Sequence, residues 1–332
     1  TNTTPDSISI NYHLSEMIKS NVKICFMEVS SHGIDQKRIE GLSFKGVIFT
    51  NLTHDHIDYH KSFANYRDTK KKIFDSLSNK SFSLINSDDR NSKYIIQNSK
   101  SSKYTYGIYN KSDYNSSILE IQLEGMLLNI DKNEVWTKLI GDFNAYNILA
   151  IYSLGKIYEL ETIKLLKAIS ELENVQGRLQ SFTTKNKITV IVDYAHTPDA
   201  LENVLKTINK IRNVDQRLIT VVGCGGDRDS KKRPLIGNLV SELSSYVIFT
   251  SDNPRSENPK EILDQILLGV TKTNSKKTDV IVKREKAIER AYKYSNTGDI
   301  VLIAGKGHEN YQELNGKKIP FDDFKIAKQI FK

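Results

Sequence analysis

The sequence predicts an α/β protein of two domains, each with a largely parallel sheet covered by helices. The chain has 332 residues, which is more than a single core of ordinary size needs. In both halves, short apolar runs rich in β-branched residues alternate with amphipathic segments, as in parallel sheets with helical crossovers. The alternation is broken at residues 173–182 (ENVQGRLQSF), so we expect a first domain over residues 1–177 and a second over 178–332.

The first domain is expected to alternate strands and helices up to its more β-rich middle. Residues 103–130 are richer in β-forming residues, and within them SSILEIQLEGMLLNI (116–130) alternates apolar and polar side chains, which predicts an antiparallel edge of the sheet. The other expected strands are VKICFMEV (22–29), GVIFTNL (46–52) and SFSLIN (81–86). The expected helices are SFANYRDTKKKIFDSL (62–77), FNAYNILAIYSLGKIY (143–158) and ETIKLLKAISEL (161–172).

The second domain restarts the rhythm and is predicted to be doubly wound. Its expected strands are KITVIVDYA (187–195), RLITVVGCGG (217–226), YVIFTSDNP (246–254), DVIVK (279–283) and DIVLIAGKG (299–307). Ligands of such sheets bind at the carboxyl ends of the strands. We therefore expect the chemistry at the polar or glycine-rich sequences DYAHTPD, GCGGDRD, SDNPR and GKGHE.

Composition excludes several classes of protein. A net charge of +8 suits an anionic partner, but the lysines are scattered and no basic arm, zinc finger or RNA-binding motif occurs, so we expect no nucleic-acid partner. No apolar run is long enough to span a bilayer and the first residues do not resemble a secretory signal, which predicts a cytoplasmic protein without membrane contact. The two cysteines are expected to be buried free thiols.

Histidines and aspartates are concentrated in NLTHDHIDYH, residues 51–60, directly after an expected strand. Glu28 ends the preceding expected strand, so its carboxylate and an imidazole of the cluster can share Mg²⁺ or Mn²⁺. Zinc is less favoured because no cysteine or HExxH pattern accompanies the histidines. Taken singly, each of these residues is more often a solvent-facing or capping side chain.

Seven segments in order resemble the Mur ligases. The resemblance runs from about Thr3 to the C-terminus. It implies a central ATPase-type domain with a parallel sheet, incomplete at its N-terminus, followed by a Rossmann-like C-terminal domain. The segments are MEVSSHGIDQKR, TNLTHDHIDYH, GDFNAYN, VDYAHTPDAL, GCGGDRDSKKRP, TSDNPR and AGKGHENYQ.

Within the family, the resemblance implies addition of the third residue of the peptidoglycan stem peptide. The D-glutamate γ-carboxylate of UDP-N-acetylmuramoyl-L-alanyl-D-glutamate would attack the γ-phosphate of ATP, and the amine of meso-2,6-diaminopimelate would then displace phosphate from the acyl phosphate. Crowded anions must be screened and held in line, which suits metal ions and cationic side chains. L-Lysine is the alternative amino acid, and we expect a monomer.

The resemblance implies a catalytic metal site for Mg²⁺ or Mn²⁺. Glu28 and His56 match the family's metal ligands, and Lys70 matches a lysine carried as a carbamate, which turns a cation into an anionic ligand. Without the resemblance, Lys70 and its two lysine neighbours would be read as an exposed helix face. His54 and His60 are expected to be ordinary surface residues.

The nucleotide and sugar-peptide contacts are likewise implied by the resemblance. The implied ATP contacts are Asn147 for the adenine, Arg178 and Asp193 for phosphate and ribose, and His196 as a weaker candidate. The implied UDP-sugar-peptide contacts are Thr3, Thr4, Ser30, Gln36 and Arg38. In isolation, TTPDS would be read as a helix start, and that reading is compatible with binding.

Arg255 in SDNPR is the implied selector of the amino acid. A guanidinium offers a bidentate fork to the distal carboxylate of diaminopimelate, which lysine lacks. Glu309 would take the distal ammonium. The remaining implied contacts of this pocket are Arg228, Asp252, Asn253, Pro254 and Gly305.

The phosphate-loop pattern GxxxxGKS or GxxxxGKT is not found in these 332 residues, whereas the family places it before the matching segment. We therefore expect a fragment, or a split ligase, with little activity alone, because the loop stabilises the transferring phosphate. Two other classes stay open. A non-catalytic nucleotide- or muropeptide-binding remnant is one, and a metal-dependent hydrolase or nucleic-acid binder is the other, although the second leaves SDNPR and GKGHE unexplained.

Overall fold

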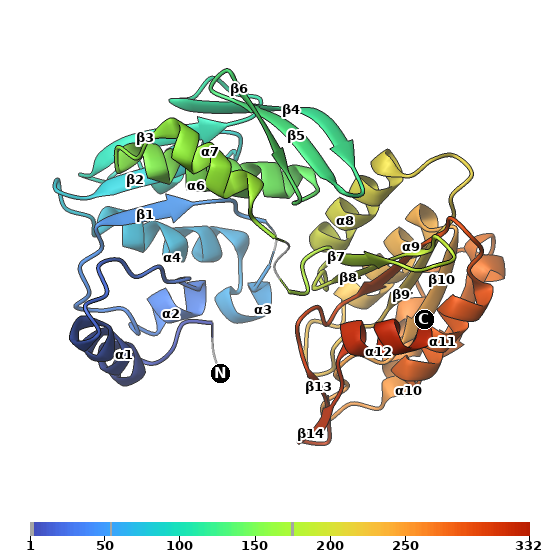
Figure 1. Ribbon diagram of the computed structural model, residues 1–332. Coiled ribbons are helices and arrows are strands. Elements are labelled where there is room, and N and C mark those ends of the chain that lie inside the picture. Colours follow the sequence, from blue (N-terminus) through green and yellow to red (C-terminus); the bar gives the residue numbers. More distant parts are fainter. Residues whose placement is uncertain (1–2, 54, 174–175) are drawn as a thin grey trace. The chain divides into compact units, whose positions relative to one another are not determined.

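The computed structural model describes residues 3–53, 55–173 and 176–332. Contacts divide the chain into two compact units, coloured along the sequence in Figure 1. The first comprises Thr1–Ser117, Leu128–Val135 and Ala145–Ile169, and the second comprises Ile118–Leu127, Trp136–Asn144 and Ser170–Lys332. The domain limits predicted at residues 177 and 178 stay a prediction. Within the described residues, no helix is both long and apolar enough to cross a membrane.

The first 170 residues hold most elements of the first unit. Its helices include α1 (Ser7–Lys19), α2 (Ser31–Asp35), α3 (Ile57–His60), α4 (Phe63–Asp75), α5 (Ser92–Ile95), α6 (Asp142–Ile157) and α7 (Thr162–Ser170). Its strands include β1 (Gly46–Phe49), β2 (Phe82–Asn86), β3 (Ser102–Gly107), β4 (Tyr114–Gln122), β5 (Gly125–Ile130) and β6 (Asn133–Thr137). Helix α6 and the strands β4 to β6 contribute residues to both units.

The first sheet has the order β1-β2-β3-β4-β5-β6, with parallel pairing from β1 to β4. Helix α4 supplies Tyr66, Ile73 and Phe74 to a core that also contains Phe49 of β1 and Ile85 of β2. Ser62 caps the helix by accepting a hydrogen bond from the backbone N–H of Asn65, which explains why the helix begins there. In the chain, α3 (Ile57–His60) lies between β1 and this helix, so the histidine-rich sequence 51–60 follows β1 and ends in α3.

The expectation of a strand at residues 22–29 is wrong. The described backbone has no strand there, and Val22, Ile24 and Phe26 are 45%, 51% and 74% exposed. Among the described residues no strand pairs with this segment, and β1 is itself an edge strand of its sheet. A buried parallel strand needs paired neighbours, and an apolar run does not supply them. Cys25 is exposed in the same segment, which corrects the prediction that both cysteines are buried.

The second unit contains the remaining elements. The helices are α8 (Pro198–Ile211), α9 (Lys232–Leu243), α10 (Pro259–Leu267), η1 (Asn274–Lys277), α11 (Arg284–Tyr294) and α12 (Asp323–Ile330). The strands are β7 (Gln180–Thr183), β8 (Thr189–Asp193), β9 (Leu218–Val222), β10 (Tyr246–Thr250), β11 (Thr278–Ile281), β12 (Ile300–Ala304), β13 (Tyr311–Leu314) and β14 (Lys317–Pro320).

The second sheet has the order β11-β10-β9-β12-β8-β7, with five parallel strands and β7 antiparallel at one edge. The register aligns the strand ends, since Phe249 pairs with Val222, Ile303 with Val221 and Ala304 with Asp193. The four sequences SDNPR, GCGGDRD, GKGHE and DYAHTPD therefore follow four adjacent strands at the same edge. This confirms the prediction of a doubly wound domain.

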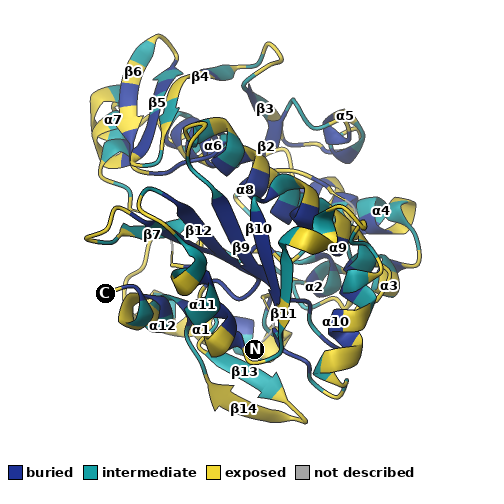
Figure 2. Cartoon of the chain, turned by 90° about the vertical axis from the view of Figure 1, so that its right-hand side faces the viewer, coloured by how far each residue is buried: buried dark blue, intermediate teal, exposed yellow. Residues whose placement is uncertain are grey.

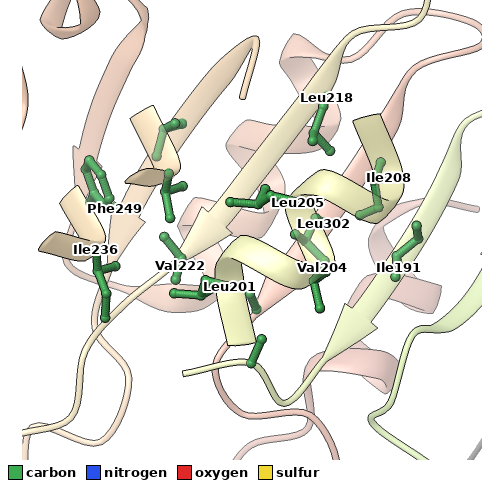
Figure 3. Close-up of a cluster of buried hydrophobic side chains, with 14 of the residues drawn as sticks. Ile191, Leu201, Val204, Leu205, Ile208, Leu218, Val222, Ile236, Phe249 and Leu302 are labelled. Atoms are coloured by element: carbon green, nitrogen blue, oxygen red, sulfur yellow. The ribbon is translucent and has the colours of Figure 1, made fainter. Parts of the chain in front are cut away.

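Helices cover both faces of this sheet. On one face, Leu201, Val204, Leu205 and Ile208 of α8 pack with side chains of α9, α10 and the strands, and Figure 3 shows them pointing at the sheet. On the other face, helices α11 and α12 pack against the alternate strand residues. The central strands are therefore buried on both sides, as the dark strands of Figure 2 show.

Candidate active site

The amino-acid pocket predicted in the second unit is built on the loops after β10 and β12. Asn253 donates to Glu309 Oε2 at 2.8 Å, and Lys306 Nζ donates to Glu309 Oε2 at 2.9 Å and to Asn253 Oδ1 at 3.0 Å. Burial favours the neutral acid, but these hydrogen bonds outweigh it and lower the pKa of Glu309. Glu309 is therefore an anion held in place, with its side chain 20% exposed.

Asp252 is buried next to this group, with its Oδ1 3.6 Å from Lys306 Nζ. Burial raises the pKa of its carboxyl, and the nearby charges of Arg284 and Lys306 offset only part of that effect. Gly305 has φ +117°, and a Cβ there would lie 2.7 Å from Asp252 Oδ2, so only glycine lets the two loops approach this closely. The structure thus brings together the predicted residues Asp252, Asn253, Gly305 and Glu309.

Arg255 joins the same pocket in a left-handed conformation, with φ +51°. Its Nη1 donates to the carbonyl oxygen of Gly226 at 2.7 Å, and its Nε lies 3.5 Å from Glu313 Oε2. The backbone is fixed as well, because Arg255 N donates to the carbonyl oxygen of Glu313 at 3.0 Å and Asn315 N to that of Arg255 at 2.7 Å. The hairpin of β13 and β14, low in Figure 1, thus holds the SDNPR loop.

Arg228 is exposed on the loop after β9. A Cβ at Gly225 would lie 2.9 Å from Arg255 Nη1 and 3.7 Å from Arg228 Cγ, so both predicted arginines approach the same glycine. The buried Arg233 braces this loop by donating to Glu257 at 2.7 and 2.8 Å and to the carbonyl oxygen of Gly225 at 3.1 Å. Pro254 is buried between the two loops, with its carbonyl oxygen close to Gly226.

Two of the predicted ATP contacts of this unit are exposed, whereas Asp193 is buried. Its two carboxylate oxygens accept hydrogen bonds from the backbone N–H groups of Leu179 and Ala195, each at 2.7 Å. Burial raises the pKa of Asp193, and these hydrogen bonds oppose the shift. Arg178 and His196 are exposed and both lie beside Tyr194, with the Arg178 guanidinium 5.0 Å from the ring centre.

A close backbone contact fixes the position of Arg178. Gly177 has φ +71°, and a Cβ there would lie 2.1 Å from the backbone nitrogen of His308. Gly307 in turn has φ +53°, and a Cβ there would lie 2.7 Å from the Gly177 carbonyl oxygen. The segment that carries Arg178 therefore runs against the GKGHE loop within the second unit.

The predicted adenine contact, Asn147, is exposed on α6 in the first unit. Its neighbour Tyr146 donates to Asp88 at 2.8 Å. Asp88 also accepts backbone hydrogen bonds from residues 108–110 at 2.7 to 3.0 Å, which fixes the loop after β3. Asn144, three residues earlier in the sequence GDFNAYN, donates to the carbonyl oxygen of Ile140 at 2.8 Å.

Four of the five predicted sugar-peptide contacts form one connected group in the first unit. Thr4 is fully buried, donates to the carbonyl oxygen of Glu28 at 3.0 Å and accepts from Ser30 N at 2.8 Å. Arg38 donates to the carbonyl oxygen of Thr4 at 2.7 Å and to Gln36. Ser30 also caps α2 by accepting from Gly33 N. The fifth, Thr3, is exposed beside this group.

The structure places the three predicted metal ligands in the first unit. Glu28 is exposed, and the His56 side chain is 43% exposed with its Nε2 3.7 Å from Asp55 Oδ2. Lys70 lies over Tyr66, with Nζ 5.5 Å from the ring centre. Burial lowers the pKa of Lys70, and the charges of Glu28 and Asp55 oppose this shift. Both carboxylates therefore act electrostatically on the Lys70 amine.

Two further histidines surround this group. The His32 ring lies 4.9 Å from that of His56 and 5.6 Å from that of His60, and burial lowers the pKa of both His32 and His60. His60 is buried, with Nε2 2.9 Å from Ser31 Oγ, so the expectation that it is a surface residue is wrong. His54 lies outside the described residues.

The described residues contain no ready group of three or more His, Cys, Asp and Glu side chains that could hold a metal ion. Glu28 and His56 supply two ligands of that kind, and the third predicted ligand is a lysine. A carbamate on Lys70 would add two anionic oxygens of the type that Mg²⁺ prefers. The donor set fits the metal only with this modification.

Sequence reasoning missed three residues of these sites. Lys306 lies inside GKGHE but was given no role. Tyr194 and His308, whose ring centres are 5.2 Å apart, lie next to the predicted contacts Arg178 and His196. All three lie within segments already singled out, so their position after β8 and β12 was the available signal. Burial, which distinguishes Lys306, has no counterpart in the sequence pattern.

Comparisons with known proteins match both parts of the chain. Residues 1–155 match a family model described as the Mur ligase middle domain, and residues 177–307 match one described as the Mur ligase glutamate ligase domain. A relative from Phocaeicola vulgatus, named UDP-N-acetylmuramoyl-L-alanyl-D-glutamate–2,6-diaminopimelate ligase, is 48% identical over 329 residues, 99% of this chain and 68% of the relative. A relative of the same name from Cytophaga hutchinsonii is 46% identical, with the same coverage.

A solved structure gives the same result for the fold. The structure of a UDP-N-acetylmuramoyl-L-alanyl-D-glutamate–2,6-diaminopimelate ligase matches with a TM-score of 0.65 and 33% identity, over 98% of this chain and 68% of that protein. Sequence relatives, family models and fold therefore agree over nearly the whole length. This chain belongs to the Mur ligase family.

Proposed function

We propose that this protein is an ATP-dependent amide ligase that adds meso-2,6-diaminopimelate to the D-glutamate γ-carboxylate of UDP-N-acetylmuramoyl-L-alanyl-D-glutamate in peptidoglycan biosynthesis. Membership of the Mur ligase family supports a ligase, and the names of the relatives support these substrates. The observation that carries the proposal is the pocket in which Arg255 and Glu309 are held by the loops after β9, β10 and β12.

The pocket suits an amino acid that is zwitterionic at its distal end. Arg255 uses Nη1 for Gly226 and Nε toward Glu313, and its remaining N–H groups suit a carboxylate. Arg228 approaches the same glycine and adds positive charge for that carboxylate. Glu309 is ionised and partly exposed, which suits the ammonium. Lysine has the ammonium without the carboxylate, so Arg255 is proposed to favour diaminopimelate.

The nucleotide contacts are proposed from position and charge. Arg178 and His196 are exposed beside Tyr194 and suit phosphate oxygens, while each carboxylate oxygen of Asp193 keeps a lone pair for a ribose hydroxyl. Asn147, exposed on α6, is proposed for the adenine. Thr3 and the group of Thr4, Ser30, Gln36 and Arg38 are proposed to hold the sugar-peptide, with Thr4 acting through the backbone that it fixes.

Glu28, His56 and Lys70 as a carbamate are proposed to hold Mg²⁺ or Mn²⁺. The placement of Lys70 near Glu28 and Asp55 supports this proposal. When bound, the metal would screen the negative charge of the carboxylate and the phosphates. Glu28 and His56 keep their side chains accessible for this role.

In the proposed reaction the γ-carboxylate attacks the γ-phosphorus of ATP, the bond to the β-phosphate oxygen breaks, and ADP leaves. Arg178 would offset the charge on the transferring phosphoryl group. Arg255 and Glu309 would hold diaminopimelate by its distal end, so that its other amine, in the neutral form, attacks the acyl carbonyl. Phosphate leaves with the electron pair of the C–O bond, and the nitrogen releases one proton to solvent. Positioning by these side chains is the contribution that the pocket geometry supports.

A ligation assay tests the proposal. The complete gene product is incubated with ATP, the UDP-linked dipeptide and either meso-diaminopimelate or L-lysine, and the UDP-linked product and ADP are measured. We expect product and ADP in equal amounts with diaminopimelate and a much lower rate with lysine. A preference for lysine would replace the amino acid in the proposal. Binding of ATP or the UDP-linked dipeptide without product would support the alternative of a non-catalytic remnant.

Two further properties are proposed on the same basis. A cytoplasmic location is proposed because the ligases that this chain resembles act on ATP and a nucleotide-linked peptide. A monomer is proposed as well, as the sequence resemblance led us to expect. Sedimentation of the purified protein checks this, and a dimer at micromolar concentration would contradict it.

A further inference from the structure

Lys306 is a buried cation to which the proposed reaction gives no role. It follows Gly305 after β12, and its side chain has 0% exposure. A buried ammonium is costly unless partners compensate it. Its Nζ donates to Asn253 Oδ1 at 3.0 Å and to Glu309 Oε2 at 2.9 Å, and lies 3.6 Å from Asp252 Oδ1.

These contacts act on one carboxylate oxygen of Glu309. Lys306 Nζ and Asn253 Nδ2 both donate to Oε2, at 2.9 and 2.8 Å, while Glu309 keeps 20% of its side chain exposed. The Glu309 carboxylate is therefore fixed from the protein side and open to a ligand on another side. Glu309 Oε2 accepts from two donors, the ammonium of Lys306 and the amide of Asn253. Without Lys306, only the uncharged amide donor would remain.

Lys306 also fixes the amide of Asn253. Asn253 Oδ1 accepts from Lys306 Nζ and from the backbone N–H of Glu313, both at 3.0 Å, which turns the Asn253 NH₂ toward Glu309. One ammonium thus sets both the orientation of the amide and the position of the carboxylate. A lysine that served only to neutralise Asp252 would not need either contact.

We propose that Lys306 is a positioning residue for amino-acid recognition, which fixes Asn253 and Glu309 so that the Glu309 carboxylate meets the distal ammonium of the incoming amino acid. This inference rests on the proposed function. Lys306 lies behind Glu309 and acts through it, since both of its hydrogen bonds go to protein groups. The pocket then selects an ammonium by a prearranged anion, with little reorganisation on binding.

The experiment compares Lys306→Met, Glu309→Gln and the double variant in the complete gene product. We expect Lys306→Met to raise the KM for diaminopimelate by about tenfold, the loss of one charge-assisted hydrogen bond, with the KM for ATP unchanged. The double variant should be close to Glu309→Gln alone, because Lys306 acts through Glu309. Lys318→Met, which removes an exposed lysine 4.2 Å from the Tyr311 ring centre, is the matched control and should change neither KM.

Other outcomes overturn the inference. Effects of the two single variants that add in the double variant would mean that Lys306 does not act through Glu309. An unchanged KM for diaminopimelate in a folded Lys306→Met protein would also show that Lys306 does not position Glu309. If the methionine variant does not fold, Lys306→Gln is used for the same measurement. A wild-type protein that uses neither diaminopimelate nor lysine would overturn the proposed function and this inference together.

Discussion

Arg284 and Asp323 form an ion pair in which both side chains are fully buried. The guanidinium donates from Nε to Oδ1 at 2.8 Å and from Nη2 to Oδ2 at 2.7 Å. Nη2 also donates to the carbonyl oxygen of Ala304, the last residue of β12, at 2.9 Å. The pair therefore ties α11 and α12 to the strand end from which Gly305, Lys306 and Glu309 follow.

Arg284→Met should destabilise the protein by about 3–5 kcal/mol, because it leaves the Asp323 carboxylate buried and unpaired. Arg290→Met is the control. This substitution removes the ion pair between Arg290 and Asp279, whose side chains are 41% and 32% exposed, respectively. The loss of unfolding free energy should be no more than about 1 kcal/mol. Denaturant unfolding measures both changes. Equally small losses of unfolding free energy in the two variants would contradict this prediction. The double variant Arg284→Met with Asp323→Leu should recover much of the stability, because no unpaired charge stays buried.

Gly177→Ala should destabilise the second unit by more than the cost of a left-handed alanine, because its Cβ would lie 2.1 Å from the backbone nitrogen of His308. Gly298→Ala provides the matched control. Gly298 has φ +89° with open space around it, so this substitution costs only about 1 kcal/mol of backbone strain. Thermal unfolding of the two variants compares them. A smaller loss in Gly177→Ala than in Gly298→Ala would show that the backbone contact with His308 is not present.

Thr4→Val should cost about 1–3 kcal/mol, because the partly buried N–H of Ser30 loses its acceptor while the shape of the side chain is kept. Thr4→Ser keeps the hydroxyl and should lose less. The unfolding free energy of each variant is measured in urea. If both variants were as stable as the wild type, the hydroxyl of Thr4 would not hold the start of α2 as the structure indicates.

Much of the second unit was predictable from the sequence, whereas part of the first was not. The runs ending in SDNPR and GKGHE are continuous and apolar because their strands are buried on both faces, which is a strong local signal. The run at residues 22–29 has the same signal but lacks a paired neighbour in the described residues, so apolarity alone gave a wrong strand. Pairing depends on distant segments, and no local pattern reports it.

Burial of polar groups was the other limit. His60 was expected at the surface and is buried against Ser31, and Lys306 was passed over although it is fully buried. Polar residues are usually exposed, so they are predicted to lie on the surface unless they belong to a motif that indicates another position. The conjunction of Asn253, Arg255 and Glu309 was predictable only because strand order brings their loops to one edge of the sheet.

Asp88 should make stability depend on pH in the acid range. Burial opposes its ionisation, but hydrogen bonds from Tyr109, Ile108, Asn110 and Tyr146 outweigh this and lower its pKa from 3.8. Its contribution is therefore present above about pH 4 and is lost as the pH falls through the folded value. Asp88→Asn should flatten the fall of the unfolding free energy as the pH is lowered below about pH 4. An unchanged slope in that variant would contradict this assignment.

Arg255 is the residue proposed to select the amino acid. Isothermal titration of the 332-residue chain with meso-diaminopimelate and with L-lysine, in the wild type and in Arg255→Ala, tests this directly. We predict that the wild type binds diaminopimelate more tightly than lysine. Arg255→Ala should weaken the binding free energy of diaminopimelate by about 2 kcal/mol, the value of a charged hydrogen bond, and should leave that of lysine unchanged. The same preference for diaminopimelate in Arg255→Ala as in the wild type would contradict the account.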